Sequence, residues 1–145
     1  MTKVVLRIVR KPETVKTFLA AFNRIEDAGA AVSGITARGV IPAGLEIMDN
    51  LCIRSVEEAV HAGYPVDAGS ILLVELDGPA AGVEAEMPIV EEVLKENNAT
   101  LIKMAKDAHE RDLFWKGRKN AFPAMGRVSS HYYVQDGVIP RSRLA

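Results

Sequence analysis

One arginine stands out among the side chains that could do chemistry. If residues 107–122 form a helix, Trp115, Arg118 and Phe122 are spaced i, i+3 and i+7 and share one helix face. The guanidinium of Arg118 would then emerge between two aromatic groups. Its planar fork matches a carboxylate bidentately, and apolar surroundings strengthen that bond while making an unpaired charge costly. The spacing therefore predicts an anionic partner for Arg118.

Two kinds of partner fit this arginine. The first is internal, and the candidate carboxylates are Glu46, Asp49 and Glu75. A related possibility without a ligand is that the Arg118 side chain extends its guanidinium to water. The second is a small carboxylate from outside, to which Tyr132 and Tyr133, in a predicted following strand, could add a hydroxyl. Spacing alone favours the internal interpretation.

The other reactive side chains indicate no independent active site. His109, Glu110 and Asp112 come nearest to a metal-ligand cluster, but this pattern is more typical of a solvated helix face. Cys52 is expected to be a buried, inert thiol, and His61 a cation at a helix C-terminus. Neither a glycine-rich dinucleotide motif nor a Walker-type loop occurs. We predict no catalytic residue and no metal site in this chain.

The composition describes one ordinary domain. The chain has 145 residues, 48% of them hydrophobic, with 18 basic and 19 acidic side chains interspersed. No basic stripe is available for nucleic acid, and no run of about 18 apolar residues could span a bilayer. The single cysteine excludes an internal disulfide, and the first residues are charged too soon for a secretory signal. These features favour a cytoplasmic protein.

The apolar pattern predicts the elements that would position Arg118. Residues 3–9 alternate β-branched side chains and are predicted as a strand, and residues 17–22 as a second, short strand. A helix is predicted over Arg24–Arg38. Asn23 opens a capping box for it, and Gly39 ends it.

The middle of the chain continues with strands and a short helix. Residues 40–48 are predicted as an extended segment. A short helix should follow, with Ser55 as its N-cap and Gly63 as its stop. The nearly continuous apolar run over residues 71–76 is typical of a strand that is covered on at least one face.

The last third of the chain is predicted to be mainly helical. Residues 80–97 carry a helical apolar stripe, but Pro88 lies inside it, and an interior proline costs about 3 kcal/mol. The regular helix should therefore begin near Met87, or the chain should kink there. Residues 100–104 are predicted as a strand, and residues 132–138 as an extended tail.

The order of these elements predicts the fold class. The middle of the chain gives strand, helix, strand, strand, helix, strand, which is the split β-α-β arrangement of a ferredoxin-like antiparallel sheet. We expect an α+β fold with helices packed on one face of the sheet, and an extra C-terminal helix and strand. Residues 1–145 should form one domain.

Several stretches, taken together, carry a family resemblance. They are Pro42–Asn50, His61–Asp67, Ile71–Gly78, Phe114–Ala124 and Tyr132–Leu144. The last two are the most specific. The chain resembles the FAD-dependent D-lactate and D-2-hydroxy-acid dehydrogenase family, which includes the FAD-linked D subunit of bacterial glycolate oxidase. The resemblance covers almost the whole chain.

The resemblance implies an enzyme that oxidises small D-2-hydroxy acids to 2-oxo acids by hydride transfer to FAD. Arg118, in the Trp-x-x-Arg motif, is implied as the ligand of the substrate carboxylate. Tyr133 is a weaker candidate for substrate binding, and Tyr133 and Asp136 lie in a segment expected near the cofactor. The family's glycine-rich flavin segment and its downstream histidines are missing. The chain therefore resembles most of the C-terminal cap or substrate domain, without the FAD-binding domain.

The implied partners follow from this assignment. A small 2-hydroxy acid would be the substrate, and a flavin-domain chain, other oxidase subunits or a second copy would be protein partners. No FAD is expected on this chain alone, which should not turn over by itself. The alternative is a stand-alone ferredoxin-like binding or dimerisation module without catalysis, because a fold does not fix a function.

Overall fold

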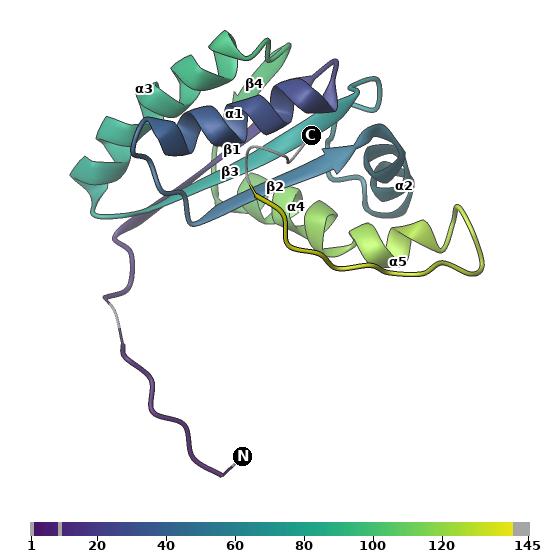
Figure 1. Ribbon diagram of the computed structural model, residues 1–145, viewed down its shortest axis with the longest axis horizontal. Coiled ribbons are helices and arrows are strands. Elements are labelled where there is room, and N and C mark those ends of the chain that lie inside the picture. Colours follow the sequence, from purple (N-terminus) through teal and green to yellow (C-terminus); the bar gives the residue numbers. More distant parts are fainter. Residues whose placement is uncertain (1, 9, 141–145) are drawn as a thin grey trace.

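A four-stranded antiparallel sheet forms the centre of the computed structural model, which describes residues 2–8 and 10–140 (Figure 1). The strand order is β2-β3-β1-β4. The strands are β1 (Thr14–Phe22), β2 (Gly44–Asp49), β3 (Ser70–Gly78) and β4 (Leu101–Met104). The helices are α1 (Ile25–Ala37), α2 (Asn50–Val60), α3 (Ala80–Glu96), α4 (Ala108–Lys119) and α5 (Ala121–Met125). The units β1-α1-β2 and β3-α3-β4 interleave, so the predicted α+β, ferredoxin-like architecture is confirmed.

Helices cover both faces of this sheet, so the prediction of helices on one face is wrong in this respect. Helices α1 and α3 form the predicted layer, and their core receives Phe18 from β1 and Val74 from β3. Helices α2, α4 and α5 lie on the opposite face, over a second core that receives Leu19 and Leu73 from the same two strands (Figure 1). Because both faces of β3 are buried, its sequence is a continuous apolar run instead of an alternating one.

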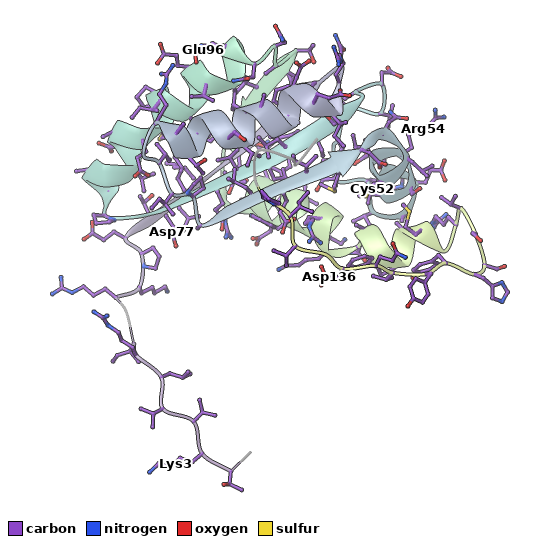
Figure 2. The ribbon with its side chains drawn as sticks, viewed as in Figure 1. Lys3, Cys52, Arg54, Asp77, Glu96 and Asp136 are labelled. Atoms are coloured by element: carbon purple, nitrogen blue, oxygen red, sulfur yellow. The ribbon has the colours of Figure 1, made fainter. Side chains whose placement is uncertain are left out.

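The predicted strand over residues 3–9 is wrong for its described part. Residues 3–8 have no regular structure and extend away from the sheet, as Lys3 does in Figure 2. Val9 lies outside the described residues. Alternation favours a strand only where a neighbouring strand can complete its hydrogen bonds, and no described strand lies beside this segment. The sheet instead begins with β1 at Thr14.

The predicted C-terminal strand is also missing from the described residues. The extra helix is present as α4 and α5, but residues 132–138 form an exposed tail without regular structure. This tail adds no strand to the sheet, whose edge strands are β2 and β4.

The ends of α1 and α2 differ from the predicted caps. Helix α1 has Arg24 as its N-cap, without a side-chain cap, so the predicted capping box at Asn23 is wrong. Helix α2 begins directly after β2, because the Asp49 carboxylate accepts a hydrogen bond from the Cys52 N–H at 2.9 Å. Ser55 therefore lies inside α2, and its hydroxyl donates to the Leu51 carbonyl.

Both helices are followed closely by a residue with a left-handed backbone conformation. Gly39 follows α1 with a φ of +83°, as the sequence predicted. Helix α2 ends earlier than predicted, at His61 with a φ of 52°, which places His61 at the helix C-terminus. Gly63, the predicted stop, comes two residues later.

Proline affects the two long C-terminal helical segments differently. Helix α3 is continuous through Pro88, so a start near Met87 is wrong. Burial of Val83, Val90 and Leu94 against the sheet offsets the lost backbone hydrogen bond.

The segment 107–122, by contrast, breaks at Asn120 into α4 and α5. Pro123 explains the break. Its ring would clash with the carbonyl of Lys119 in a continuous helix, but the first turn of a new helix tolerates a proline.

Candidate functional site

Arg118 of α4 has an internal partner. Its Nε lies 2.8 Å from Oε2 of Glu46, which is one of the three carboxylates that the sequence offered. The two side chains are 31% and 34% exposed, so the pair lies at the edge of the second core and not in the deep interior. The internal interpretation is therefore correct for one edge of the guanidinium.

The alternation of β2 explains why Glu46 faces α4. Leu45 and Ile47 pack into the core beneath α1 and α3. Met48 belongs to the opposite core, and Glu46, two residues before it, points to the same side of the sheet. The strand therefore presents the carboxylate to the helix layer that carries Arg118.

Tyr64 fixes the position of α4. Its hydroxyl donates to the carbonyl of Phe114, and burial raises the pKa of this hydroxyl well above its ordinary value. A Cβ at Gly117 would lie only 2.5 Å from the Tyr64 hydroxyl oxygen. Glycine at this position therefore lets α4 approach the loop after α2, which sets the residue next to it, Arg118, against β2.

A second ion pair joins α4 to the sheet. The Glu75 carboxylate accepts from Nε and Nη2 of Arg111, both at 2.9 Å, from the Thr17 hydroxyl at 2.8 Å and from the Trp115 indole at 2.5 Å. Burial would raise the pKa of Glu75, but these hydrogen bonds outweigh burial and hold the pKa below its ordinary value. The sequence pattern did not single out Arg111. Its position four residues before Trp115 was the available signal.

Arg118 and Phe122 border one groove, with a volume of about 370 Å³. We call it the Arg118 groove. Its lining residues are Ile25, Glu46, Ile47, Met48, Asp49, Cys52, Arg118, Ala121 and Phe122. Trp115 borders a different groove together with Arg111. The predicted face with Arg118 between two aromatic groups is therefore wrong, because the helix breaks at Asn120 before it reaches Phe122.

The guanidinium keeps one edge available to a ligand. The closest contact of Glu46 with the guanidinium is at Nε, and the described residues form no hydrogen bond with Nη1 or Nη2 of Arg118. Two parallel N–H groups on one edge match the two oxygens of a carboxylate. The groove can therefore accept a small carboxylate without losing the Glu46 pair.

Cys52, on α2 (Figure 2), borders the same groove and is only partly buried, so the prediction of a buried thiol is wrong. Burial and the nearby Asp49 carboxylate raise the pKa of the thiol, although Arg118 acts in the opposite direction. The thiol therefore stays neutral near pH 7, and a neutral thiol is a poor nucleophile.

Tyr133 and Asp136 lie on the exposed tail. Tyr133 is 87% exposed, and neither residue borders the Arg118 groove. Figure 2 shows Asp136 on the tail that follows α5. Tyr132 is likewise exposed and in no strand, so the tail does not complete the groove in this conformation.

The acidic residues at the start of α4 have partners within the protein. Glu110 pairs with Lys103 at 2.6 Å, and this contact lowers its pKa. Asp112 pairs with Arg111 at 3.3 Å. No group of three metal-ligating side chains occurs within residues 2–8 and 10–140.

The N-termini of the helices bear on flavin binding. Asp49 and Asp107 cap α2 and α4, and the Glu13 carboxylate accepts from the Ala80 N–H at the start of α3. Helix α1 has Glu26 and Asp27 in its first turn. Since a pyrophosphate is held by free N–H groups at a helix N-terminus, these four described helices do not fit one.

Among the described helices, none has the length and apolar character needed to cross a membrane.

Comparisons with known proteins agree with the sequence resemblance. The glycolate oxidase subunit GlcD of Escherichia coli K12 is 50% identical over 143 residues, and that of Bacillus subtilis 34% over 145 residues. A probable mitochondrial D-lactate dehydrogenase of Danio rerio is 27% identical over 146 residues. The matches cover 99%, 100% and 99% of this chain, but 29%, 31% and 29% of the relatives. The chain thus spans less than a third of their length.

The fold has solved counterparts. A structure of alkyldihydroxyacetonephosphate synthase matches 81% of this chain and 24% of its own, with a TM-score of 0.59 at 17% identity. This similarity shows a shared fold. Residues 11–145 match the family described as FAD linked oxidases, C-terminal domain. Because that match spans nearly the whole chain, the protein belongs to this family of FAD-linked oxidases.

Proposed function

We propose that this chain is most of the cap or substrate domain of an FAD-linked oxidase that converts small D-2-hydroxy acids, such as glycolate or D-lactate, to 2-oxo acids. Its contribution is to bind the substrate carboxylate through Arg118. The 50% identity to the glycolate oxidase subunit of Escherichia coli supports the substrate class.

The free edge of Arg118 carries this proposal. The described residues form no hydrogen bond with Nη1 or Nη2, and Ile47, Met48 and Phe122 are apolar residues of the groove lining. A charge-assisted, bidentate contact in such surroundings is stronger than one in open water. Glu46 holds Nε, so it fixes the plane of the guanidinium before a ligand arrives.

The remaining chemistry belongs to other parts of the protein. Oxidation at C2 removes a hydride from carbon and a proton from the hydroxyl group, and the family name assigns electron acceptance to FAD. The helix N-termini described above do not fit its pyrophosphate, so we place the flavin on a separate domain or chain. The relatives called subunits support additional protein partners.

Tyr133 is the second proposed contact with the substrate. Its hydroxyl would reach the groove only if the tail folded over α5. A bound substrate or the flavin-bearing part of the protein would supply the surface for such a movement. The role of Tyr133 is therefore conditional on the tail, whereas that of Arg118 is not.

Titration of the chain with glycolate tests the proposal. We expect saturable chemical-shift changes of the Arg118 side-chain N–H groups in NMR spectra, and at least a tenfold weaker affinity in Arg118→Gln, which corresponds to about 1.4 kcal/mol. Lys119→Gln, a change of the same charge outside the groove, is the control. Equal binding by Arg118→Gln and wild type would contradict the carboxylate role and favour a binding or dimerisation module.

A further inference from the structure

We propose that Glu46 limits the Arg118 groove to acids with a single carboxylate. This inference rests on the proposed function, because it takes the groove as the place where Arg118 binds a 2-hydroxy acid. It adds a specificity role for a residue that the sequence offered only as an internal partner.

The charges of the groove support this restriction. Among the described residues that line the groove, Arg118 is the single cation, and Glu46 and Asp49 are the two anions. Most of the other lining side chains are apolar, and the Cys52 thiol is neutral because of its raised pKa. The groove therefore offers one attractive contact to an anion and two repulsive ones.

A dicarboxylic acid would leave one charge unpaired in this groove. Its first carboxylate can take the Nη edge of Arg118, as the carboxylate of glycolate would. Its second carboxylate would then lie near Glu46 and Asp49 or against apolar walls such as Phe122 and Ile47. Both positions are unfavourable, because like charges repel and an unpaired charge loses its hydration.

Of the two acidic residues in the groove, Glu46 should repel a second ligand carboxylate more strongly than Asp49 does. Asp49 accepts a hydrogen bond from the Cys52 N–H at the N-terminus of α2, and that positive helix end balances part of its charge. The carboxylate of Glu46 has only the contact with Arg118 among the described residues. Glu46, directly beside the guanidinium, would therefore repel the second carboxylate of a dicarboxylic acid.

Parallel titrations with glycolate and D-malate test the inference. The ratio of the two affinities is measured by NMR at low ionic strength, where charge effects are not screened. We expect Glu46→Gln, which keeps the side-chain shape, to raise the affinity for D-malate relative to glycolate about fivefold. Asp49→Asn, which retains the helix cap, should raise it less.

Asp112→Asn is the matched control for net charge, because Asp112 lies outside the Arg118 groove and borders the groove of Arg111 and Trp115. The ratio of the affinities for D-malate and glycolate in Asp112→Asn should equal that of wild type. If Glu46→Gln does not fold, Glu46→Thr removes the same charge with a residue that favours strands.

Each outcome separates the inference from the proposed function. An unchanged ratio in Glu46→Gln, or an equal rise in Asp112→Asn, overturns the specificity role of Glu46. The carboxylate role of Arg118 still stands in that case if Arg118→Gln loses glycolate binding. If Arg118→Gln binds glycolate as wild type does, both proposals fail.

Discussion

Two arginines of α4 face the sheet, seven residues apart, and each pairs with a glutamate of a strand. Arg111 meets Glu75 of β3 through two of its nitrogens, and Thr17 and Trp115 donate to the same carboxylate. Arg118 meets Glu46 of β2 most closely through Nε, at 2.8 Å. The Glu75 side chain is 13% exposed, whereas that of Glu46 is 34% exposed.

This difference distinguishes a structural ion pair from the proposed carboxylate site. Nε and Nη2 of Arg111, the Thr17 hydroxyl and the Trp115 indole all donate to Glu75, so the Arg111 pair mainly holds α4 to the sheet. Nη1 and Nη2 of Arg118 carry four N–H groups that make no hydrogen bond to the described residues, so Glu46 orients the guanidinium without using all of its donors. The number of satisfied donors therefore distinguishes the two arginines better than their residue type or their helix does.

The largest expected effect disturbs both arginines at once. In Gly117→Ala, the new Cβ would clash with Tyr64 and push α4 away from the sheet. We expect the free energy of unfolding to fall by about 2 to 3 kcal/mol, measured by urea denaturation. Gly82→Ala in α3, where a Cβ would meet nothing within 4 Å, is the control and should not destabilise the protein. Equal behaviour of the two variants would contradict the role of Tyr64.

The next effect should separate the two ion pairs. Glu75→Gln removes the charge that three donor residues share, and we expect a loss of about 2 kcal/mol in the free energy of unfolding. Glu46→Gln removes a half-exposed single contact, and we expect a loss below about 1 kcal/mol. Urea denaturation of both variants measures the contrast. Similar losses would mean that both pairs are structural.

The smallest effect is the pH dependence that Glu75 contributes. The pKa of Glu75 is lower in the folded protein than its ordinary value of 4.5, so the unfolded chain binds more protons between these two values. The stabilisation is therefore fully present above the ordinary pKa and is lost as the pH falls through the folded-state pKa. The stability difference between wild type and Glu75→Gln should shrink on acidification below about pH 4.5. A difference that stayed constant would contradict the lowered pKa.

Local sequence signals predicted the elements that depend only on their own residues. The apolar period of residues 24–38 with Gly39 behind it predicted α1, and the apolar run over residues 71–76 predicted β3 within two residues at each end. Such elements combine a strong pattern with a terminator in the same short stretch. The order of these elements then predicted the sheet topology.

Elements that depend on a distant partner were predicted less well. The pattern of residues 3–9 is typical of a strand, but the described residues 3–8 have no neighbour in the sheet, and residues 132–138 likewise lack one. The start of α2 was misplaced because Asp49, at the end of a strand, also caps the helix. The sequence pattern marked Asp49 as the end of a strand and did not show that the same residue also begins the next helix.

The candidate site shows the same division. Spacing identified Arg118 as a cation in need of an anion and named Glu46 among three carboxylates. It could not tell Glu46 from Glu75, because both alternate onto the same face of the sheet, on neighbouring strands. The break at Asn120 also moved Phe122 off the face of α4 that carries Trp115.

The sequence by itself determined the chemistry: an arginine that requires an acid, a ferredoxin-like order of elements, and membership of a family of FAD-linked oxidases. Only the tertiary structure decided which glutamate each arginine of α4 meets and which N–H groups remain free. The physical reason is that apolar periodicity acts between residues close in the chain, whereas an ion pair is set by distances of a few ångströms between elements. Those distances depend on how closely α4 can approach the sheet, which Gly117 and Tyr64 control.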